Sequence, residues 1–551
     1  MGAVAGTGAD VTLTTGRVYG DADEHVGRAS ATERLFSAWV FWCGLALLVA
    51  SAWWYGRGLW FYSDEWNIIA VHHSGHWTEG FNGQWLLIPT LFFRILLEIF
   101  GLFTYWPFRL VGLAWYTALI VVFHNWARKR VRPAAAALAA LAIAWYSTSW
   151  NVVMMPLLMN FTIPCVMLFA VWMLLDRDDR RSDIWAAVCL LVGMLSSNVG
   201  LVVCVIIGVE FAVSRTRWRR WWIFLPAAVV WVPWYLIWYE PISKRAAVTH
   251  AAHWGIGLTE NYAKGFFAGW RVGQWIWLAV LIAVAIWALW QRRWNARSIG
   301  LAVGTVFFVT GASFRAADFH IPIPPDPNWY LWFYSVLVAA LLVELGRGER
   351  VPLSWLAAVA VVVAISAAQL HGSLADFHSN GLLLKRNART WFAAADALGD
   401  QASPDATMGV NIVQLPVRDY TSLRRDLGSL APGVTLAQLG DEGTRRTVDA
   451  WMVSQLGVTV EPGSGPRKVC RPAPGASGPW GAGLPRGAEV RITTRDGSGD
   501  VRLRRFAGGF SPTPFARIEP QHTVHFAVPS DHSSVPWHVQ VDGGAEVQVC
   551  E

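Results

Sequence analysis

Residues 37–66 read SAWVFWCGLALLVASAWWYGRGLWFYSDEW, an apolar run followed closely by an acidic pair. The run from Ser37 to Tyr55 has about the length that an α-helix needs to cross the hydrocarbon core of a membrane. Asp64 and Glu65 follow in a belt of aromatic residues, where a charged pair costs free energy unless it is solvated, paired or used. The pair is therefore a candidate functional site, and a solvated loop end is the alternative.

The composition predicts a polytopic membrane protein. The chain has 551 residues, of which 54% are hydrophobic and 35 are tryptophan, and this usage fits extensive contact with a bilayer. The formal charge of +7 comes from arginines in short clusters between apolar runs, which is typical of cytoplasmic membrane loops and requires no nucleic-acid partner. Residues 1–33 lack the features of a signal peptide, so we expect a disordered cytoplasmic tail.

The apolar runs predict about eleven membrane spans in a domain of residues 34–370. Residues 86–103 are left out of this count because Thr90, Arg94 and Glu98 form a polar stripe on an otherwise apolar helix, which favours an interfacial helix over a spanning one. Residues 56–105 then form the first outer loop. The predicted spans are residues 37–55, 106–126, 134–150, 155–175, 184–196, 199–213, 221–238, 272–290, 299–313, 330–345 and 353–370.

Loop charge predicts the orientation of these spans. The loops on the side of the N-terminus contain 16 Lys and Arg, against about six in the opposite short loops. Because positive charge collects on the cytoplasmic side, the N-terminus is expected inside and the Asp64 loop outside. The predicted cytoplasmic loops are residues 128–132, 176–183, 215–220, 292–297 and 347–350.

Two spans in this list, residues 184–196 and 199–213, are short for a full crossing. The connection between them reads Ser196-Ser197-Asn198-Val199-Gly200. Irregular backbone at membrane depth is tolerated where protein or a watery cavity satisfies it. The pair is either two half-buried helices that line a site or a tight hairpin of tilted spans.

Two long outer loops contribute further candidate residues on the side of Asp64. Residues 240–270 are long enough to fold over a cavity, and residues 314–329 contain four prolines that restrict the chain. His72 and His73, with His76, lie in the first outer loop, where they could bind a divalent cation, although contacts with solvent or substrate are favoured. The candidates in the two long loops are Lys244, Arg245, His253, Arg315, Asp318 and His320.

Residues 371–551 have the composition of a soluble, extracytoplasmic domain. Alternating runs that begin at Glu489, Val501, His522 and Trp537 predict half-buried strands, and hence a β-rich fold. Cys470 and Cys550 are the two cysteines of this region. A lone pair in an exported domain predicts a disulfide rather than a metal site.

The candidate residues suit transfer of a sugar from a membrane-held polyprenyl phosphate. A P-loop and a Gly-x-Gly-x-x-Gly motif after a strand are both missing from the sequence, so nucleotide phosphates have no recognisable cradle. A carboxylate can act as general base on an acceptor hydroxyl, and cations can stabilise the phosphate that leaves. A transporter or lipid flippase and a non-catalytic scaffold are the alternatives.

The order of these features resembles the opening of the GT-C class of membrane glycosyltransferases, such as protein O-mannosyltransferases and the lipid A aminoarabinose transferase. The resemblance covers residues 35–126 by motif and 35–370 by topology. It is carried by Asp64-Glu65 after the first span, Ser74-Gly75-His76-Trp77, Phe100-Gly101 and Pro107-Phe108-Arg109-Leu110. The family's lysine-proline-proline is absent, and Leu87-Ile88-Pro89 stands there instead.

The resemblance implies a multi-pass plasma-membrane enzyme that acts at the outer face, inverts the anomeric configuration and glycosylates an envelope glycan or lipid. Asp64 would be the base or the group that positions the acceptor, with Glu65 as its partner or alternate. Lys244, Arg245 or Arg315 would contact the donor phosphate. The residues expected to contact substrate are Trp66, His72, His73, His253, Asp318 and His320; for Trp66 and the cations, a role as interfacial anchor or solvated charge is the alternative. The high usage of Ala, Gly, Arg and Trp is typical of a GC-rich bacterium with a complex envelope, for which arabinose or mannose would be a suitable sugar.

Overall fold

The structure of the chain is a computed structural model. It describes residues 30–74, 83–238, 253–258, 261–262, 265–266, 271–291, 293–318, 328–349, 351–411, 413–431, 434–465, 468–473, 475–478 and 480–551. Its contacts divide the chain into two compact units. The first comprises Met1–Tyr55, Gly80–Pro89 and Arg109–Ala375, and the second comprises Gly56–Glu79, Thr90–Phe108 and Asp376–Glu551.

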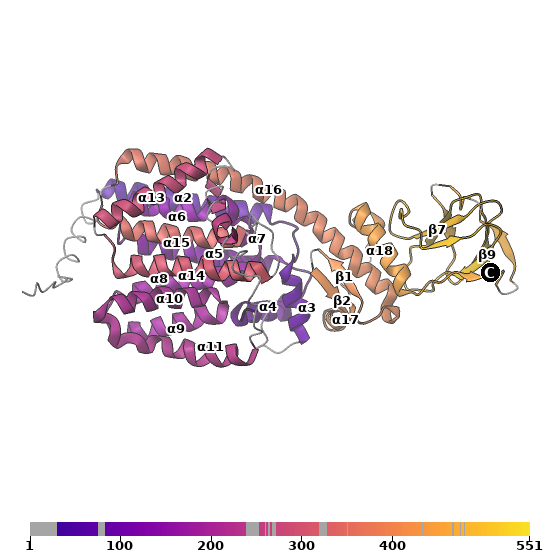
Figure 1. The fold of residues 1–551 in the computed structure, drawn as a ribbon, viewed down its shortest axis with the longest axis horizontal. Coiled ribbons are helices and arrows are strands. Elements are labelled where there is room, and N and C mark those ends of the chain that lie inside the picture. Colours follow the sequence, from indigo (N-terminus) through magenta and orange to yellow (C-terminus); the bar gives the residue numbers. More distant parts are fainter. Residues whose placement is uncertain are drawn as a thin grey trace, which may run out of the picture. The chain divides into compact units, whose positions relative to one another are not determined.

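The first unit is a bundle of helices (Figure 1). Helix α8 packs against α9, α10 against α14, and α2 against α6. Short 3₁₀ segments η1 (Ser147–Ser149), η2 (Pro156–Leu158) and η3 (Arg215–Phe224) interrupt the series. The helices are α2 (Ala31–Tyr55), α5 (Trp106–Ala127), α6 (Pro133–Ala144), α7 (Trp150–Met154), α8 (Met159–Leu175), α9 (Arg180–Ser196), α10 (Val199–Val213), α11 (Leu225–Trp238), α13 (Arg271–Trp290), α14 (Ala296–Asp318), α15 (Asn328–Leu345) and the first part of α16 (Leu353–Leu398).

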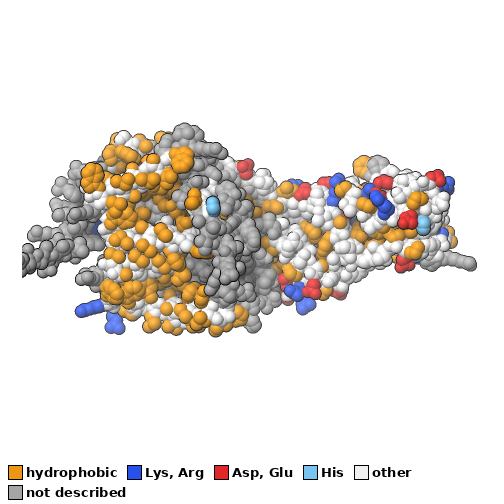
Figure 2. All heavy atoms as spheres, viewed as in Figure 1, with side chains coloured by type: hydrophobic (Ala, Val, Ile, Leu, Met, Phe, Trp, Pro, Cys, Tyr) orange, Lys and Arg blue, Asp and Glu red, His pale blue; other side chains and the backbone are white. Residues whose placement is uncertain are grey.

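The helices of this unit are those of a multi-pass membrane protein. Within the described residues, six helices are long and apolar enough to cross a membrane, or seven if the bent pair Pro133–Ala144 and Ser147–Met154 counts as one span. Large apolar side chains such as Trp39, Leu236 and Trp290 are exposed on them, and Figure 2 shows apolar side chains covering much of their visible surface. Such a surface is stable in lipid rather than in water. Helices occupy all eleven predicted spans, but several of them, such as Val199–Val213, are shorter than a full crossing of a membrane needs.

Two helices differ most from their predicted ranges. Residues 134–150 were expected to form one span, but α6 ends at Ala144 and the chain bends by 50° before it continues. Long-range hydrogen bonds hold the break: Tyr146 donates to the Tyr262 carbonyl at 2.7 Å and Ser147 donates to the Gly265 carbonyl at 2.7 Å. Helix α16 does not end at residue 370 but runs from Leu353 to Leu398, 46 residues in all, or about 69 Å at 1.5 Å per residue.

One end of the helical unit contains a buried network of charges. Arg130 pairs with Glu344 at 2.5 Å, and Arg297 pairs with Glu210 at 2.9 Å and with Asp176. Arg217 pairs with Glu210 at 2.5 Å. The side chains of Glu210 and Glu344 are at most 3% exposed. These residues lie in or beside the predicted cytoplasmic loops, and their pairing brings those segments together at one end of the bundle.

The second unit joins the Asp64 segment to the C-terminal residues. It contains α3 (Asp64–Ser74), most of α4 (Leu87–Phe100), the rest of α16, α17 (Val417–Leu427) and α18 (Glu442–Gln455), with the hairpin of β1 (Thr407–Val410) and β2 (Val413–Pro416). Helix α3 packs against β2 and α17 (Figure 1). The compact units divide the chain at other points. They do not test the predicted boundaries at residues 33 and 370, which stay predictions.

The C-terminal β-rich region predicted from alternation is confirmed. It forms two antiparallel sheets with the strand orders β5-β10-β7-β8 and β3-β9-β6-β11-β4. Strands β7 and β10 alternate buried with partly exposed side chains, as strands with one buried face do. The strands are β3 (Glu461–Pro462), β4 (Cys470–Pro472), β5 (Ala482–Leu484), β6 (Glu489–Thr493), β7 (Gly499–Arg504), β8 (Ala516–Ile518), β9 (Thr523–Ala527), β10 (Trp537–Val541) and β11 (Glu546–Cys550).

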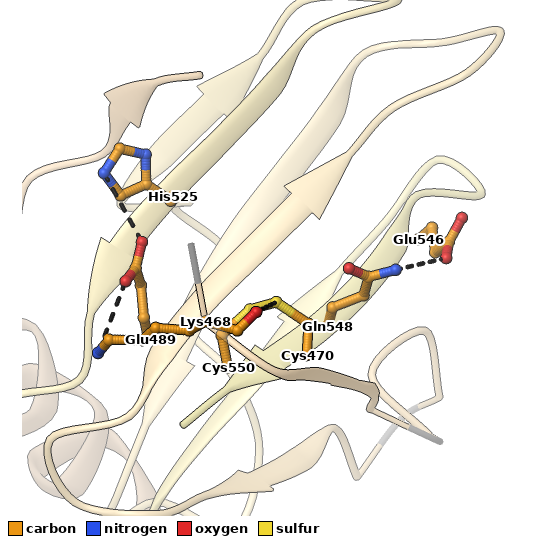
Figure 3. Close-up of a disulfide and its surroundings, with 7 residues drawn as sticks. All are labelled: Lys468, Cys470, Glu489, His525, Glu546, Gln548 and Cys550. Atoms are coloured by element: carbon orange, nitrogen blue, oxygen red, sulfur yellow. Dashed lines mark hydrogen bonds and ion pairs between the residues drawn. A yellow bond between two sulfur atoms is a disulfide. The ribbon is translucent and has the colours of Figure 1, made fainter. Parts of the chain in front are cut away.

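The predicted disulfide between Cys470 and Cys550 is also confirmed. It joins β4 to β11, which are neighbouring strands with Cys470 opposite Cys550 (Figure 3). On the adjacent strand β6, the buried Glu489 carboxylate lies 3.7 Å from Lys468 and 3.8 Å from His525. Because disulfides persist in oxidising compartments, the bond fits a location of this domain outside the cytoplasm.

Replacing both cysteines by serine is expected to destabilise the β-rich region. Removal of the cross-link returns conformational entropy to the unfolded chain, and the expected loss is about 2 to 4 kcal/mol. The measurement is the unfolding of the full-length protein followed by the fluorescence of its tryptophans and by proteolysis between the strands. Equal resistance of the serine variant and the parent would contradict the prediction.

Candidate functional site

The acidic pair lies at the start of a short helix. After α2 ends at Tyr55, the chain passes through Ser63, which has a left-handed φ of 52°, and α3 begins at Asp64. The backbone N–H groups of Glu65 and Trp66 donate to the carbonyls of Tyr62 and Ser63 at 3.1 and 3.0 Å. A residue other than glycine rarely takes such a φ, and positions of this kind recur at functional sites.

The two carboxylates of the pair have different surroundings. Glu65 is 0% exposed, and its Oε2 accepts hydrogen bonds from the Tyr62 N–H at 3.0 Å and from the Tyr105 hydroxyl at 2.9 Å. A buried carboxylate needs such donors to offset its lost hydration. Glu65 therefore fixes the turn that precedes α3 and connects it to the segment before α5.

Replacing Tyr105 by phenylalanine is expected to destabilise the second unit by about 1.5 to 3 kcal/mol, because the buried Glu65 carboxylate loses a charge-assisted hydrogen bond. The ring and its edge contact with Phe61, at a centroid distance of 4.8 Å, would remain. Unfolding of the full-length protein in detergent measures the change. Tyr235, on α11 in the other unit, offers a matched control, and Tyr235→Phe is expected to leave the second unit unchanged.

Asp64 is the more exposed carboxylate of the pair. It is only partly buried, and its Oδ1 accepts a hydrogen bond of 3.5 Å from the Asn67 amide. Burial and the nearby Asp64 charge raise the pKa of Tyr62. The carboxylate also lies at a helix N-terminus, where backbone N–H groups favour negative charge. A partly exposed carboxylate in this position is able to accept a proton from a bound hydroxyl.

Trp66 lies in the core of the second unit. It is 0% exposed and its indole N–H donates to the Phe61 carbonyl at 3.0 Å. Its ring contacts Trp60 and, at 5.1 Å between centroids, Phe392 of α16. Phe392 in turn stacks on Tyr420 of α17 at 4.9 Å. The aromatic residues around the acidic pair thus belong to one core with the C-terminal residues, and the described position of Trp66 is one of packing.

Arg315 lies at the end of α14 in the helical unit. Its guanidinium donates two hydrogen bonds, of 2.7 and 2.6 Å, to the amide oxygen of Gln84 when that amide is oriented to accept them. The same segment is held by Asn198, which donates to the Gly83 carbonyl at 2.9 Å, and by Trp234, which stacks on Trp85 at a centroid distance of 5.3 Å. Arg315, which was predicted to contact phosphate, is therefore bonded to a segment that residues from two other parts of the chain hold in place.

The remaining candidates are only partly covered by the described residues. His253 is exposed. His72, His73 and Asp318 belong to α3 and α14, but their side chains lie outside the described part of the structure, as do Lys244, Arg245 and His320 entirely. Among the described residues, His, Cys, Asp and Glu side chains form no group of three or more that could hold a metal ion.

Sequence reasoning did not single out Tyr105 or Asn198 as site residues. Tyr105 has a weak signal, since it lies just before the motif Pro107-Phe108-Arg109-Leu110. Asn198 has a stronger one, because it is a polar residue in a short turn between two apolar helices, where irregular backbone requires a partner.

Comparison of the chain with protein-family models, with curated proteins and with solved structures gave no match. The fold therefore defines the class: this is a multi-span helical membrane protein with a C-terminal β-rich domain that contains a disulfide. No family is assigned to it.

Proposed function

We propose that this protein is a GT-C-type glycosyltransferase that moves a sugar from a polyprenyl phosphate to an acceptor hydroxyl at the outer face of the plasma membrane. The observation that carries the proposal is the division of the acidic pair: Glu65 is buried and bonded, whereas Asp64 is partly exposed at the start of α3. The proposal includes about eleven spans, a cytoplasmic N-terminus and an extracytoplasmic C-terminal domain, in keeping with the loop charges.

The proposed reaction is a single displacement. Asp64 accepts the proton of the acceptor hydroxyl, and the hydroxyl oxygen forms a bond to the anomeric carbon. The bond between that carbon and the phosphate oxygen breaks, and polyprenyl phosphate leaves with the electron pair. Arg315 is the described candidate for stabilising the charge on the departing phosphate. Attack from the face opposite the leaving group inverts the anomeric configuration.

The membrane setting supports a lipid-linked donor. The prenyl tail of such a donor stays in the bilayer while its headgroup reaches the outer surface, where nucleotide sugars have no ready supply. The acceptor is an envelope glycan or lipid, and the C-terminal domain is proposed to position it. A divalent cation is not part of the proposed mechanism.

The test is reconstitution of the full-length protein in liposomes with a radiolabelled polyprenyl phosphomannose or phosphoarabinose and a membrane extract as the source of acceptors. A glycosyltransferase moves the label from lipid to acceptor. A flippase instead moves the intact labelled lipid between leaflets, and a scaffold does neither. Either of the last two results would overturn the proposal.

A further inference from the structure

Four distant segments meet at the end of the helical unit where α9 joins α10. We call this the polar junction and define it as Gln84, Trp85, Asn160, Asn198 and Arg315. The Ser197 hydroxyl donates to the Asn160 carbonyl at 2.8 Å, and Asn198 donates to the Gly83 carbonyl at 2.9 Å. Since Gln84 and Trp85 follow Gly83, these bonds connect the loop, the start of α8 and the turn from α9 to α10.

The turn that carries Asn198 is held by close backbone packing. A Cβ atom added to Gly200 would lie 2.4 Å from the Gly193 carbonyl oxygen, so α9 and α10 approach each other more closely than a side chain would allow. The Val199 N–H also donates to the Ser197 hydroxyl at 3.1 Å. The Asn198 side chain is thus presented by a fixed turn, as a binding residue requires.

Among the described residues, three buried polar atoms of the polar junction have no hydrogen-bond partner: Oδ1 of Asn160, Oδ1 of Asn198 and Nε1 of Trp85. Asn160 and Trp85 are each 5% exposed. The orientation of Asn198 is set by its bond to Gly83, because a carbonyl accepts only from the amide N–H. Leaving a buried polar atom unpaired is unfavourable, so a bound partner would relieve a penalty.

The mixture of two acceptors and one donor selects the chemistry of that partner. An ammonium group only donates and an ionised phosphate only accepts, whereas a hydroxyl does both. We propose that the polar junction binds the sugar of the lipid-linked donor through the hydroxyl groups of that sugar. This inference rests on the proposed function and assigns Asn160, Asn198 and Trp85 to substrate specificity, beside Arg315.

The experiment compares two ligands, polyprenyl phosphomannose and sugar-free polyprenyl phosphate, binding to the full-length protein in nanodiscs. Asn160→Leu and Trp85→Phe remove one acceptor and one donor while keeping most of the side-chain volume. Each is expected to weaken binding of the sugar-bearing lipid by about 10-fold, the equivalent of about one hydrogen bond. Binding of the sugar-free lipid should be unchanged, which also shows that the variants are folded. Trp480→Phe, at an exposed tryptophan of the β-rich region, is the matched control and should change neither.

Three results would overturn the inference, and they are distinguishable. If the parent protein binds neither lipid, the proposed function fails with it. If the parent binds both and transfers sugar but the variants match it, buried water serves these atoms and only the inference fails. If the variants lose both lipids equally, the polar junction supports the fold rather than the sugar.

Discussion

Replacing Asp64 by asparagine is expected to lower the rate of sugar transfer by about 10² to 10⁴-fold, the usual contribution of a general base. Asparagine has nearly the same size as aspartate, and its amide oxygen retains an acceptor for the Asn67 amide, which bonds Asp64 at 3.5 Å. It cannot take up a proton from the acceptor hydroxyl. The rate of label transfer in liposomes measures the effect, and the unfolding midpoint of the variant should match that of the parent.

Asp400→Asn is the matched control for this substitution. Asp400 is an exposed carboxylate in η4 (Gly399–Gln401) of the same compact unit, so the same change of charge is made outside the candidate site. Transfer by this variant should stay within about twofold of the parent, since exposed charges at a distance are screened. Full activity of Asp64→Asn, or a loss of activity equal to that of Asp400→Asn, would remove Asp64 from the mechanism.

Much of the fold follows from local pattern. Apolar runs predicted the positions of the helices because a helix in lipid satisfies its own backbone and must be apolar on its surface. Alternation predicted strands such as β7 and β10, and the cysteine pair predicted the disulfide. The helices and strands depend on residues that are neighbours in the sequence, and the disulfide depends on a single pair of cysteines.

The parts that pattern did not predict depend on contacts between distant residues. The break after Ala144 is held by hydrogen bonds from Tyr146 and Ser147 to carbonyls more than 100 residues away. Trp66 shows the same limit: a tryptophan near the end of a span is typical of the membrane interface, but its partner here is Phe392. No local feature indicates that partner.

In the candidate site, too, local features could be predicted and contacts between distant residues could not. The position of the Asp64 and Glu65 pair after the first span could be predicted, since charge beside an apolar run stands out. The sequence could not show which of the two carboxylates is buried, because the Tyr105 hydroxyl that bonds Glu65 comes from a segment 40 residues further on. Arg315 was predicted to contact the donor phosphate, but its hydrogen bonds to Gln84 could be found only from the structure.

Arg297→Met is expected to destabilise the helical unit by about 3 to 5 kcal/mol, because it leaves buried carboxylates without a full complement of charge. The network formed by Arg130, Arg217, Arg297, Asp176, Glu210 and Glu344 has equal numbers of positive and negative side chains. Removing Arg297 leaves one negative charge in excess, and the partners that Glu210 keeps among the described residues are Arg217 and the Trp172 indole N–H. Unfolding of the full-length protein in detergent measures the loss.

The double variant Arg297→Met with Glu210→Met tests whether charge balance or geometry carries this stability. It restores neutrality and fills the space with apolar groups, and such replacements of buried ion pairs are often neutral or stabilising. We therefore expect it to recover most of the loss. Arg418→Met supplies the exposed comparison, since the ion pair of Arg418 with Asp405 is 64% and 83% exposed and such pairs contribute at most about 1 kcal/mol. A double variant no more stable than Arg297→Met would show that the hydrogen-bond geometry of the network, rather than its neutrality, holds these helices together.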